Sequence, residues 1–332
     1  MFDNKKVLIT GGTGSLGNAL TTRLLKTNVD TIRIFSRNES KQVEMETKFK
    51  DQRLRFFIGD VRDRERLITA LQDVDIVIHA AALKHVPVVE YNPFESIKTN
   101  VIGSQNVIDA CLSQNVETAI CVGTDKSVSP LNAYGATKLL MEKLFITANN
   151  YLNPKKFRTK FHAVRYGNVM GSSGSVIPKF IEQIKSGKKI TITDPQMTRF
   201  NITMEQALDL IIDCAINGKE SETYIPKLKA YSIMDVKDAL FELLKNTGEE
   251  IIGIRPGEKI HETLIGKDEI KYSWDLRNKY MLANPFRSER DIMDSYDNNI
   301  TKVDNMDTYS SDKVELMSTK QIKKIILNSG LL

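Results

Sequence analysis

The chain has 332 residues, which is enough for one large hydrophobic core or two smaller ones. Apolar residues make up 41% and charged residues 27%, as in ordinary soluble globular proteins. The net charge of +5 is small and the basic residues are scattered, which argues against nucleic-acid binding. No apolar run approaches the roughly 20 residues of a membrane helix, and no signal peptide fits before the first apolar run. We therefore expect a soluble, cytoplasmic protein.

Short apolar runs alternate with helical patterns through the first half of the chain. The predicted strands span residues 5–10, 31–36, 55–60, 74–81, 118–124 and 160–167. The predicted helices span residues 17–27, 39–49, 63–72, 95–114 and 134–150. This alternation, with right-handed crossovers, predicts an α/β fold with a doubly wound parallel Rossmann sheet.

The alternation ends after Gly167, and mainly loops and short elements are expected in 168–200 and from 224 onward. A clear helix is predicted for 203–217 with Thr203 as its N-cap, and another near 318–327. We expect a dinucleotide-binding domain, a smaller mixed cap that binds substrate, and a C-terminal arm with a helix. Their expected ranges are 1–168 plus about 201–223, then 169–200 with 224–285, then 286–332.

The turn after the first predicted strand is rich in glycine. Gly12-x-Gly14-x-x-Gly17 matches the dinucleotide fingerprint, and Gly11-x-x-Gly14-x-x-Gly17 matches its common variant. Small residues let backbone N–H groups approach a pyrophosphate at the helix N-terminus. A plain tight turn is the alternative, but the strand before and the helix after favour a dinucleotide site. The predicted contacts in this turn are Gly11, Thr13, Gly14, Ser15, Leu16 and Gly17.

The end of the second predicted strand indicates which dinucleotide binds. NAD proteins usually carry an acid there for the ribose 2′-hydroxyl, whereas this chain has Ser36 and Arg37. Arg37 can pair with a 2′-phosphate, with Ser36 and Lys41 assisting, so NADP(H) is favoured over NAD(H). Arg37 can alternatively be a solvated surface residue. Asp60 and Val61, after the third strand, are placed to meet the adenine.

A tyrosine and a lysine, Tyr134 and Lys138, lie four residues apart on one face of the predicted helix 134–150. A free phenol has a pKa of about 10 and is a poor base near neutral pH. A neighbouring ammonium stabilises the phenolate and lowers that pKa. The pair can therefore take a hydroxyl proton while a hydride leaves to the nicotinamide.

Together these features resemble the extended short-chain dehydrogenase/reductase superfamily, whose usual substrates are nucleotide sugars. Thr124-Asp125-Lys126 narrows the resemblance, because a lysine at its third position is typical of inverting UDP-N-acetylglucosamine 4,6-dehydratases. The resemblance covers roughly residues 4–285, and Tyr134 is typical of the subgroup that feeds pseudaminic acid synthesis. Further family-like segments, in family order, span residues 80–87, 98–100, 165–168, 174–178, 197–200 and 255–259.

The resemblance implies a mechanism. Tyr134, aided by Thr124 and Lys138, deprotonates the sugar 4-hydroxyl while the C4 hydride moves to NADP+. Lys126, as a neutral amine, then removes the C5 proton, and Asp125 protonates the departing 6-hydroxyl. Hydride returns to C6 and a proton enters C5 from the opposite face, giving UDP-2-acetamido-2,6-dideoxy-β-L-arabino-hex-4-ulose. We expect burial and the neighbouring Lys138 to lower the pKa of Lys126 toward the neutral state.

The resemblance also implies the remaining ligand contacts and the partners. Ala80, Ala81, Ala82, Lys84 and Asn100 are expected at the cofactor, together with Tyr134 and Lys138. A UDP-sugar is the expected partner, and relatives form dimers or hexamers. Each expected substrate residue can alternatively be structural within the cap. The expected substrate residues are Lys84, Asn168, Val176, Arg199, Arg255 and Glu258.

Two other functions use the same fold. A UDP-sugar 4-epimerase or reductase would need Tyr134 and Lys138 but not the Asp125-Lys126 pair. A non-catalytic NADP(H)-binding sensor typically loses the tyrosine and lysine, which this chain keeps. The cysteines Cys111, Cys121 and Cys214 form neither a CxxC pair nor a metal-ligand spacing, so no disulfide framework and no metal site are expected.

Overall fold

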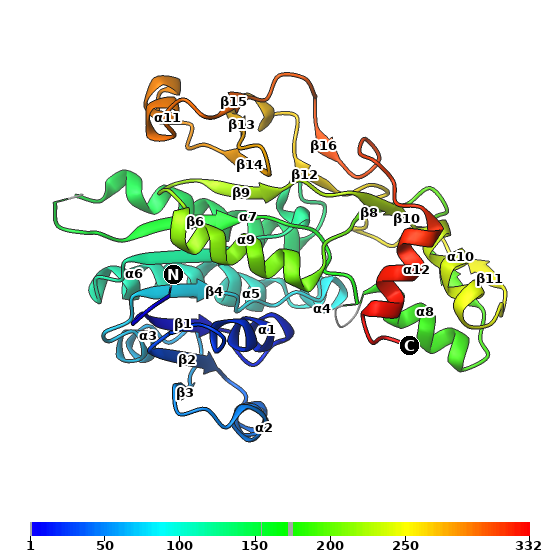
Figure 1. The fold of residues 1–332 in the computed structure, drawn as a ribbon, viewed down its shortest axis with the longest axis horizontal. Helices are drawn as coiled ribbons and strands as arrows, with labels where there is room; N and C mark the ends of the chain where they lie inside the picture. Colours follow the sequence, from blue (N-terminus) through cyan, green and yellow to red (C-terminus); the bar gives the residue numbers. More distant parts are fainter. Residues whose placement is uncertain (1, 154, 172–174) are drawn as a thin grey trace.

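The computed structural model describes residues 2–153, 155–171 and 175–332. Figure 1 shows a central sheet with helices on both faces. Seven of its strands run parallel in the order β3-β2-β1-β4-β5-β6-β9, which contains the Rossmann order and confirms the predicted fold class. In chain order they are β1 (Lys6–Thr10), β2 (Thr31–Ser36), β3 (Leu54–Ile58), β4 (Ile76–His79), β5 (Thr118–Val122), β6 (Lys160–Val164) and β9 (Thr223–Pro226).

Alternate residues of the parallel strands enter two separate cores, as expected for strands covered on both faces. In β1, Val7 and Ile9 pack with α1 (Ser15–Leu24) and α9 (Met204–Asn217), and Met45 of α2 (Glu39–Phe49) joins this side. Leu8 packs on the opposite side. The helices that line this second core are α3 (Arg64–Ala70), α6 (Gly103–Ser113) and α7 (Ala133–Ala148).

The predicted helix 95–114 is interrupted. After α4 (Val86–Tyr91), the structure has a short α5 (Pro93–Ser96), a π-helical turn at Ile97–Ile102, and then α6. Such turns are rare in proteins, and those that occur are often found at functional sites. This one carries Asn100, which is fully buried.

Three further strands extend the sheet beyond β9 in antiparallel fashion. They are β14 (Lys279–Leu282), β13 (Ser273–Asp275) and β15 (Thr301–Lys302), and they lie above β9 in Figure 1. The stretch expected to be an extended arm thus contributes β15, a helix α11 (Glu289–Ser295) and a strand β16 (Tyr309–Ser310). Sequence-based expectation missed these elements because each is short.

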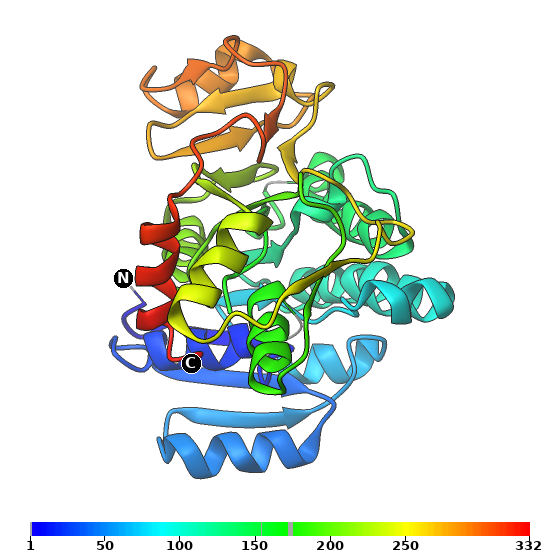
Figure 2. The same ribbon diagram turned by 90° about the vertical axis from the view of Figure 1, so that its right-hand side faces the viewer.

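A separate hydrophobic cluster forms where the chain continues past the sheet. It joins α8 (Val176–Lys185), α10 (Ile233–Leu243) and α12 (Thr319–Asn328), which Figure 2 shows side by side. Mainly loops and short elements were expected for the residues of α8 and α10, whereas both are regular helices. Three short strand pairs flank this cluster: β7 (Ile190–Ile192) with β11 (Glu249–Ile251), β8 (Thr198–Phe200) with β10 (Ala230–Ser232), and β12 (Thr263–Ile265) with β16.

Among the described residues, no helix is long and apolar enough to cross a membrane. Cys111, Cys121 and Cys214 are buried and unpaired. Within the part of the chain that the structure describes, no group of histidine, cysteine and carboxylate side chains is arranged to bind a metal ion. His79, which sits in the centre of the sheet, is bonded at both ring nitrogens, to Thr10 and Ser104.

Candidate active site

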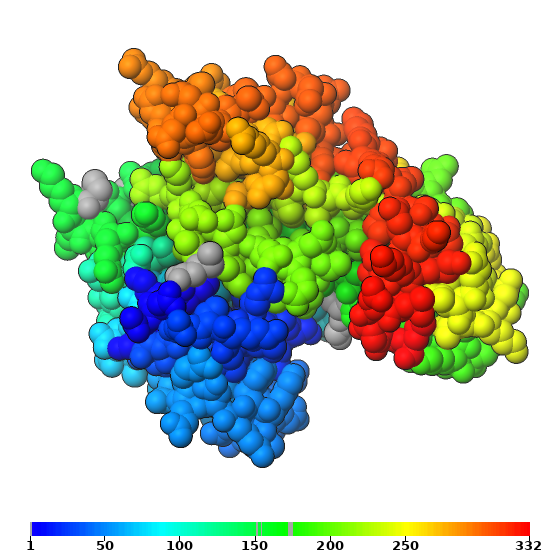
Figure 3. All heavy atoms as spheres, viewed as in Figure 1, coloured from blue at the N-terminus to red at the C-terminus, as the bar shows by residue number. Residues whose placement is uncertain are grey.

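A cavity of about 370 Å³ opens beyond the carboxyl ends of β5 and β6, between the sheet and the cluster of α8, α10 and α12. Ligands of open α/β sheets bind at this edge. The cavity brings together nine predicted site residues from distant parts of the chain: Lys84, Thr124, Lys126, Tyr134, Asn168, Val176, Arg199, Arg255 and Glu258. Figure 3 shows the notch in the surface between the sheet domain and the C-terminal helix.

The glycine turn has the geometry that a pyrophosphate requires. Gly11 has φ of +67°, and a Cβ there would lie 2.9 Å from the Ala81 backbone in the loop after β4. A Cβ at Gly17 would lie 2.1 Å from the Gly12 carbonyl oxygen. Helix α1 begins after Gly14 without a side-chain cap and without an acidic residue in its first turn. Its N–H groups and its positive dipole end are therefore available for an anion.

Packing at Gly17 gives a stability prediction. We expect Gly17→Ala to lower the free energy of unfolding by about 1–3 kcal/mol, because the new methyl group overlaps the Gly12 carbonyl. Gly14→Ala is the matched control. Its Cβ would lie 3.2 Å from the Gly11 carbonyl oxygen, a much milder contact than the 2.1 Å at Gly17, so its loss of stability should be smaller. Chemical denaturation of both variants measures the difference, and equal losses would contradict the packing argument.

The predicted specificity residues lie at the ends of β2 and β3. The Arg37 side chain is 55% exposed, and its guanidinium lies 3.7 Å from the Asp60 carboxylate. Asp60 is bonded more closely by Arg62, at 2.7 Å. Ser36 is buried and its hydroxyl accepts a hydrogen bond from Gln42, whereas Lys41 is exposed. Arg37 and Lys41 are thus the accessible cations here.

The loop after β4 is held by Asn100 rather than left free. The Asn100 side chain accepts from the Leu83 N–H at 2.8 Å and donates to the Leu83 carbonyl at 3.0 Å. It also donates to the hydroxyls of Ser96 and Thr137. With these bonds made, Asn100 positions the backbone of residues 80–84. Lys84, at the end of this loop, is exposed toward the cavity.

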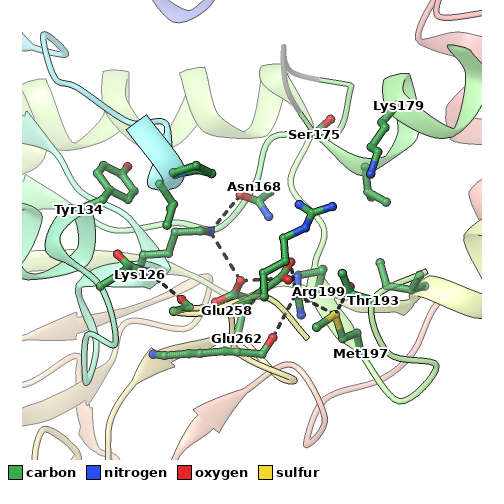
Figure 4. A pocket seen from close by; sticks show the side chains of 18 of the residues that line it. Lys126, Tyr134, Asn168, Ser175, Lys179, Thr193, Met197, Arg199, Glu258 and Glu262 are labelled. Atoms are coloured by element: carbon green, nitrogen blue, oxygen red, sulfur yellow. Dashed lines mark hydrogen bonds and ion pairs between the residues drawn. The ribbon is translucent and has the colours of Figure 1, made fainter. Parts of the chain in front are cut away.

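Thr124-Asp125-Lys126 follows β5 directly, where the chain turns into a short 3₁₀ helix. The Thr124 hydroxyl donates to Asp125 Oδ1 at 2.9 Å, and Lys126 Nζ donates to the same oxygen at 3.2 Å. Asp125 is fully buried, and its Oδ2 has no hydrogen-bond partner among the described residues. Lys126 extends toward Asn168, whose Oδ1 it meets at 3.3 Å (Figure 4).

The charge state of Lys126 differs from the expected one. Burial lowers the pKa of this lysine, but Asp125 and Glu262 raise it by more, so its pKa lies above the usual value. Glu262 Oε1 lies 3.5 Å from Lys126 Nζ. Lys138, expected to lower the pKa of Lys126, is not among the groups that affect it. Beside these two carboxylates Lys126 is therefore an ammonium ion.

Tyr134 and Lys138 lie on the buried face of α7, as predicted. Burial raises the pKa of the Tyr134 phenol, while Lys126 and Thr124 partly offset that rise. The expected contribution of Lys138 is absent, because its ammonium donates to the Val122 carbonyl at 2.6 Å. Burial lowers the pKa of Lys138 to about 8.

Some of the predicted substrate residues already make hydrogen bonds within the protein, and others have polar groups without such partners among the described residues. The Arg199 guanidinium is buried and donates to the carbonyls of Thr198, Lys259 and Ile260. Arg199 therefore holds the 258–262 segment. Val176 lines the cavity at the start of α8, and Gly174, which precedes it in the expected family-like segment, lies outside the described residues.

Glu258 lies on the segment that Arg199 holds, and Arg255 comes shortly before that segment. Arg255 is exposed at the cavity mouth and makes no ion pair within the described part of the chain. Glu258 Oε2 is buried and has no hydrogen-bond partner there, and its Oε1 lies 3.9 Å from Arg199. Arg255 is thus free for a phosphate and Glu258 for a hydroxyl donor.

Two charged residues that line the cavity, Glu262 and Lys179, were not predicted from the sequence. Glu262 is almost fully buried and contacts both Lys126 and Arg199, at 3.5 Å each. Lys179 of α8 faces Arg255 and Glu258, and burial lowers its pKa. The nearness of Glu262 to the expected Arg255–Lys259 motif was the one signal in the sequence.

The sheet order, the glycine turn and the cavity residues place the chain among Rossmann-type α/β proteins. Residues 7–284 match the profile of the family described as "Polysaccharide biosynthesis protein", so the chain belongs to that family.

Relatives of this chain carry two different activity names. The "UDP-N-acetylglucosamine 4,6-dehydratase (inverting)" of Campylobacter jejuni subsp. jejuni is 48% identical over 285 residues, which is 85% of this chain and 84% of the relative. The "UDP-glucose 4-epimerase" of Rickettsia prowazekii is 40% identical over 332 residues, covering 98% and 96% of the two chains. A solved structure, "X-ray structure of Pen from Bacillus thuringiensis", superposes with a TM-score of 0.91 and 38% identity over all of both chains.

Proposed function

We propose that the chain is an inverting UDP-N-acetylglucosamine 4,6-dehydratase, a hydro-lyase that produces UDP-2-acetamido-2,6-dideoxy-β-L-arabino-hex-4-ulose. The observation that carries this proposal is the Asp125-Lys126 pair, in which Lys126 lines the cavity and contacts the buried Asp125 at 3.2 Å. Elimination of water needs a base at C5 and an acid at the 6-hydroxyl. The dehydratase-named relative that is 48% identical supports the same reaction.

A nicotinamide dinucleotide fits the site, because the uncapped α1 N-terminus and the tight glycine turn form an anion cradle. Gly11 to Gly17 would hold the pyrophosphate, Ser36, Arg37 and Lys41 the adenosine ribose, and Asp60 and Val61 the adenine. Ala80, Ala81, Ala82 and Lys84 would border the remaining part, with Asn100 fixing their loop. When bound, the cofactor accepts a hydride from the sugar and returns it within one turnover.

The protein's own residues supply the proton transfers. Tyr134, next to Thr124, takes the 4-hydroxyl proton, and Lys138 fixes the start of α7 by its bond to Val122. Asp125 and Glu262 raise the pKa of Lys126, so the shared proton of the Asp125-Lys126 pair starts on Lys126. Moving that proton across the 3.2 Å contact makes Lys126 a neutral amine and Asp125 a carboxylic acid. One internal transfer thus creates both the base for C5 and the acid for the departing hydroxyl.

NADP(H) is the proposed dinucleotide, because Arg37 is exposed and no acid stands at the end of β2. We expect Arg37→Ala to weaken NADP(H) binding at least about 10-fold relative to NAD(H), the effect of losing a charged hydrogen bond. Dissociation constants of both dinucleotides measure this ratio. Lys48→Ala, at an exposed cation on helix α2, which begins shortly after Arg37, is the control. An unchanged ratio in Arg37→Ala would overturn the assignment.

A UDP-sugar 4-epimerase is the second candidate. It is favoured by the Rickettsia relative of that name, which matches 98% of this chain, whereas the dehydratase-named relative matches 85%. Incubation with UDP-N-acetylglucosamine and no added NADPH separates the two. A 4-keto-6-deoxy product supports the dehydratase, and UDP-N-acetylgalactosamine as the sole product overturns it.

Location and assembly complete the proposal. The three buried, unpaired thiols suit a reducing cytoplasm. A homo-oligomer, either a dimer or a hexamer, is the proposed assembly. Sedimentation of the purified protein measures this directly.

A further inference from the structure

Lys126 is held between two carboxylates, one of which stands far away in the sequence. Asp125 Oδ1 lies at 3.2 Å and Glu262 Oε1 at 3.5 Å from Lys126 Nζ. Asp125 has an assigned role as proton acceptor, but nothing in the proposed reaction yet uses Glu262. Glu262 is 4% exposed, and its Oε2 has no hydrogen-bond partner within the described residues. A buried carboxylate with a free oxygen costs stability, so its retention at this position calls for a function.

The position of Glu262 is fixed by the C-terminal arm. The Glu262 N–H donates to the Ser311 hydroxyl at 2.9 Å, and the Ser311 N–H donates to the Glu262 carbonyl at 2.8 Å. The Ser311 hydroxyl also meets the Thr198 hydroxyl at 2.7 Å. Ser311 is fully buried and lies directly after β16, which pairs with β12. It belongs to the part of the chain that follows the family match of residues 7–284.

We propose that Glu262 is a positioning residue that keeps the shared proton on Lys126 until substrate arrives, and that Ser311 of the C-terminal arm holds Glu262 in place. This inference rests on the proposed function, because it assigns Glu262 a part in that reaction. The arm then connects to the reacting pair through the Glu262 carboxylate and two hydrogen bonds, one between backbone groups and one from the Glu262 N–H to the Ser311 hydroxyl. Without Glu262, Asp125 alone would hold the ammonium, and the proton would pass to Asp125 more readily.

Other charged groups also face the Lys126 ammonium and set the size of the effect. Asp125 attracts it from the same 3₁₀ turn, and Arg199 of β8 opposes it. Arg199 itself contacts Glu262, so removal of Glu262 also leaves Arg199 unopposed at that side. The titratable and charged groups that interact with Lys126 include Asp125, Tyr134, Arg199, Tyr231, Lys259 and Glu262.

The test compares Glu262→Gln, Glu262→Asp, Ser311→Ala and Ser310→Ala with the unmodified protein. Competitive acetylation of Lys126 across a pH series, read by peptide mass spectrometry, reports the lysine's ionisation without any turnover. Removing the negative charge favours the neutral amine, so Glu262→Gln should move the labelling midpoint to lower pH by about one unit. Glu262→Asp keeps the negative charge, so its labelling midpoint should lie close to that of the unmodified protein. Ser311→Ala should move the midpoint in the same direction as Glu262→Gln, by less.

Ser310→Ala is the matched control for Ser311→Ala. Its hydroxyl donates to Asp312 and makes no contact with Glu262, so its labelling curve should follow that of the unmodified protein. The ascending limb of kcat against pH should shift as the labelling does, with KM changed less than about twofold. An unchanged labelling midpoint in Glu262→Gln overturns the inference. If Glu262→Gln does not fold, Ser311→Ala decides in the same way.

The two proposals fail separately. If the unmodified protein forms no 4-keto-6-deoxy sugar, the proposed function fails while the acetylation series still reports the charge held on Lys126. If it forms that product and the labelling midpoints of all variants coincide, the role of Glu262 fails and the dehydratase remains.

Discussion

Lys126→Ala is expected to lower the rate of dehydration by about 1,000-fold or more while leaving dinucleotide binding intact. General acid–base groups commonly contribute 100- to 10,000-fold, and this substitution removes the C5 base and the proton donor to Asp125 together. The cofactor residues are untouched, since Lys126 contacts Asp125, Asn168 and Glu262. Turnover of UDP-N-acetylglucosamine and dinucleotide titration measure the two effects.

The control for this variant is Lys185→Ala, at the exposed end of α8. It removes one positive charge from the same part of the molecule without touching the cavity, so turnover should be unchanged. A 4-epimerase would not need Lys126, so near-normal conversion of UDP-N-acetylglucosamine by Lys126→Ala would contradict the dehydratase and favour the second candidate.

Arg165→Met is expected to lower the free energy of unfolding by about 3–5 kcal/mol, the cost of breaking a buried ion pair. Arg165 of the segment after β6 is fully buried between Glu142 of α7 and Glu269. Its guanidinium lies 2.5 Å from Glu142 and 2.8 Å from Glu269, and it also donates to the Leu264 carbonyl. The methionine would leave two carboxylates facing each other without a cation, and it would detach α7 from the segment after Glu262.

Two further variants make this stability prediction specific. Arg290→Met removes a guanidinium that is 90% exposed and only 3.8 Å from Asp294, so it should cost less than about 0.5 kcal/mol. Glu142→Gln added to Arg165→Met should recover part of the loss, because one buried charge disappears. Denaturant unfolding of each purified variant gives the values. A loss below about 1 kcal/mol for Arg165→Met would show that the carboxylates are not held by this arginine.

Much of the Rossmann half was predictable, because each strand and helix there is one unbroken pattern. The strands at β1, β2, β5 and β6 begin and end within a few residues of the expected positions. The helix predicted for 95–114 was too long, since a π-helical turn leaves no mark in apolar spacing. Helix α8 carries Pro178 in its first turn, where proline is tolerated, although mainly loops and short elements were expected for this part of the chain.

The members of the site were more predictable than their charges. Thr124, Asp125, Lys126 and Tyr134 all reach the cavity or its wall, because they follow one strand and open one helix. The ionisation of Lys126 depends on Glu262, which arrives from a distant segment held by Ser311. Local sequence contains no information on that contact, so the expected lowering of the Lys126 pKa was wrong. The expected effect of Lys138 on Lys126 and Tyr134 also could not be judged from the sequence, because its ammonium donates to the Val122 carbonyl.

The most direct test of the proposed function is NMR analysis of the product formed from UDP-N-acetylglucosamine in deuterated water. The proposed proton transfer removes the C5 proton and returns one from solvent on the opposite face. We expect a 4-keto-6-deoxy sugar that carries deuterium at C5 with inverted configuration, formed without added NADPH. Protium retained at C5, or a product that differs from the substrate only at C4, would contradict the assignment.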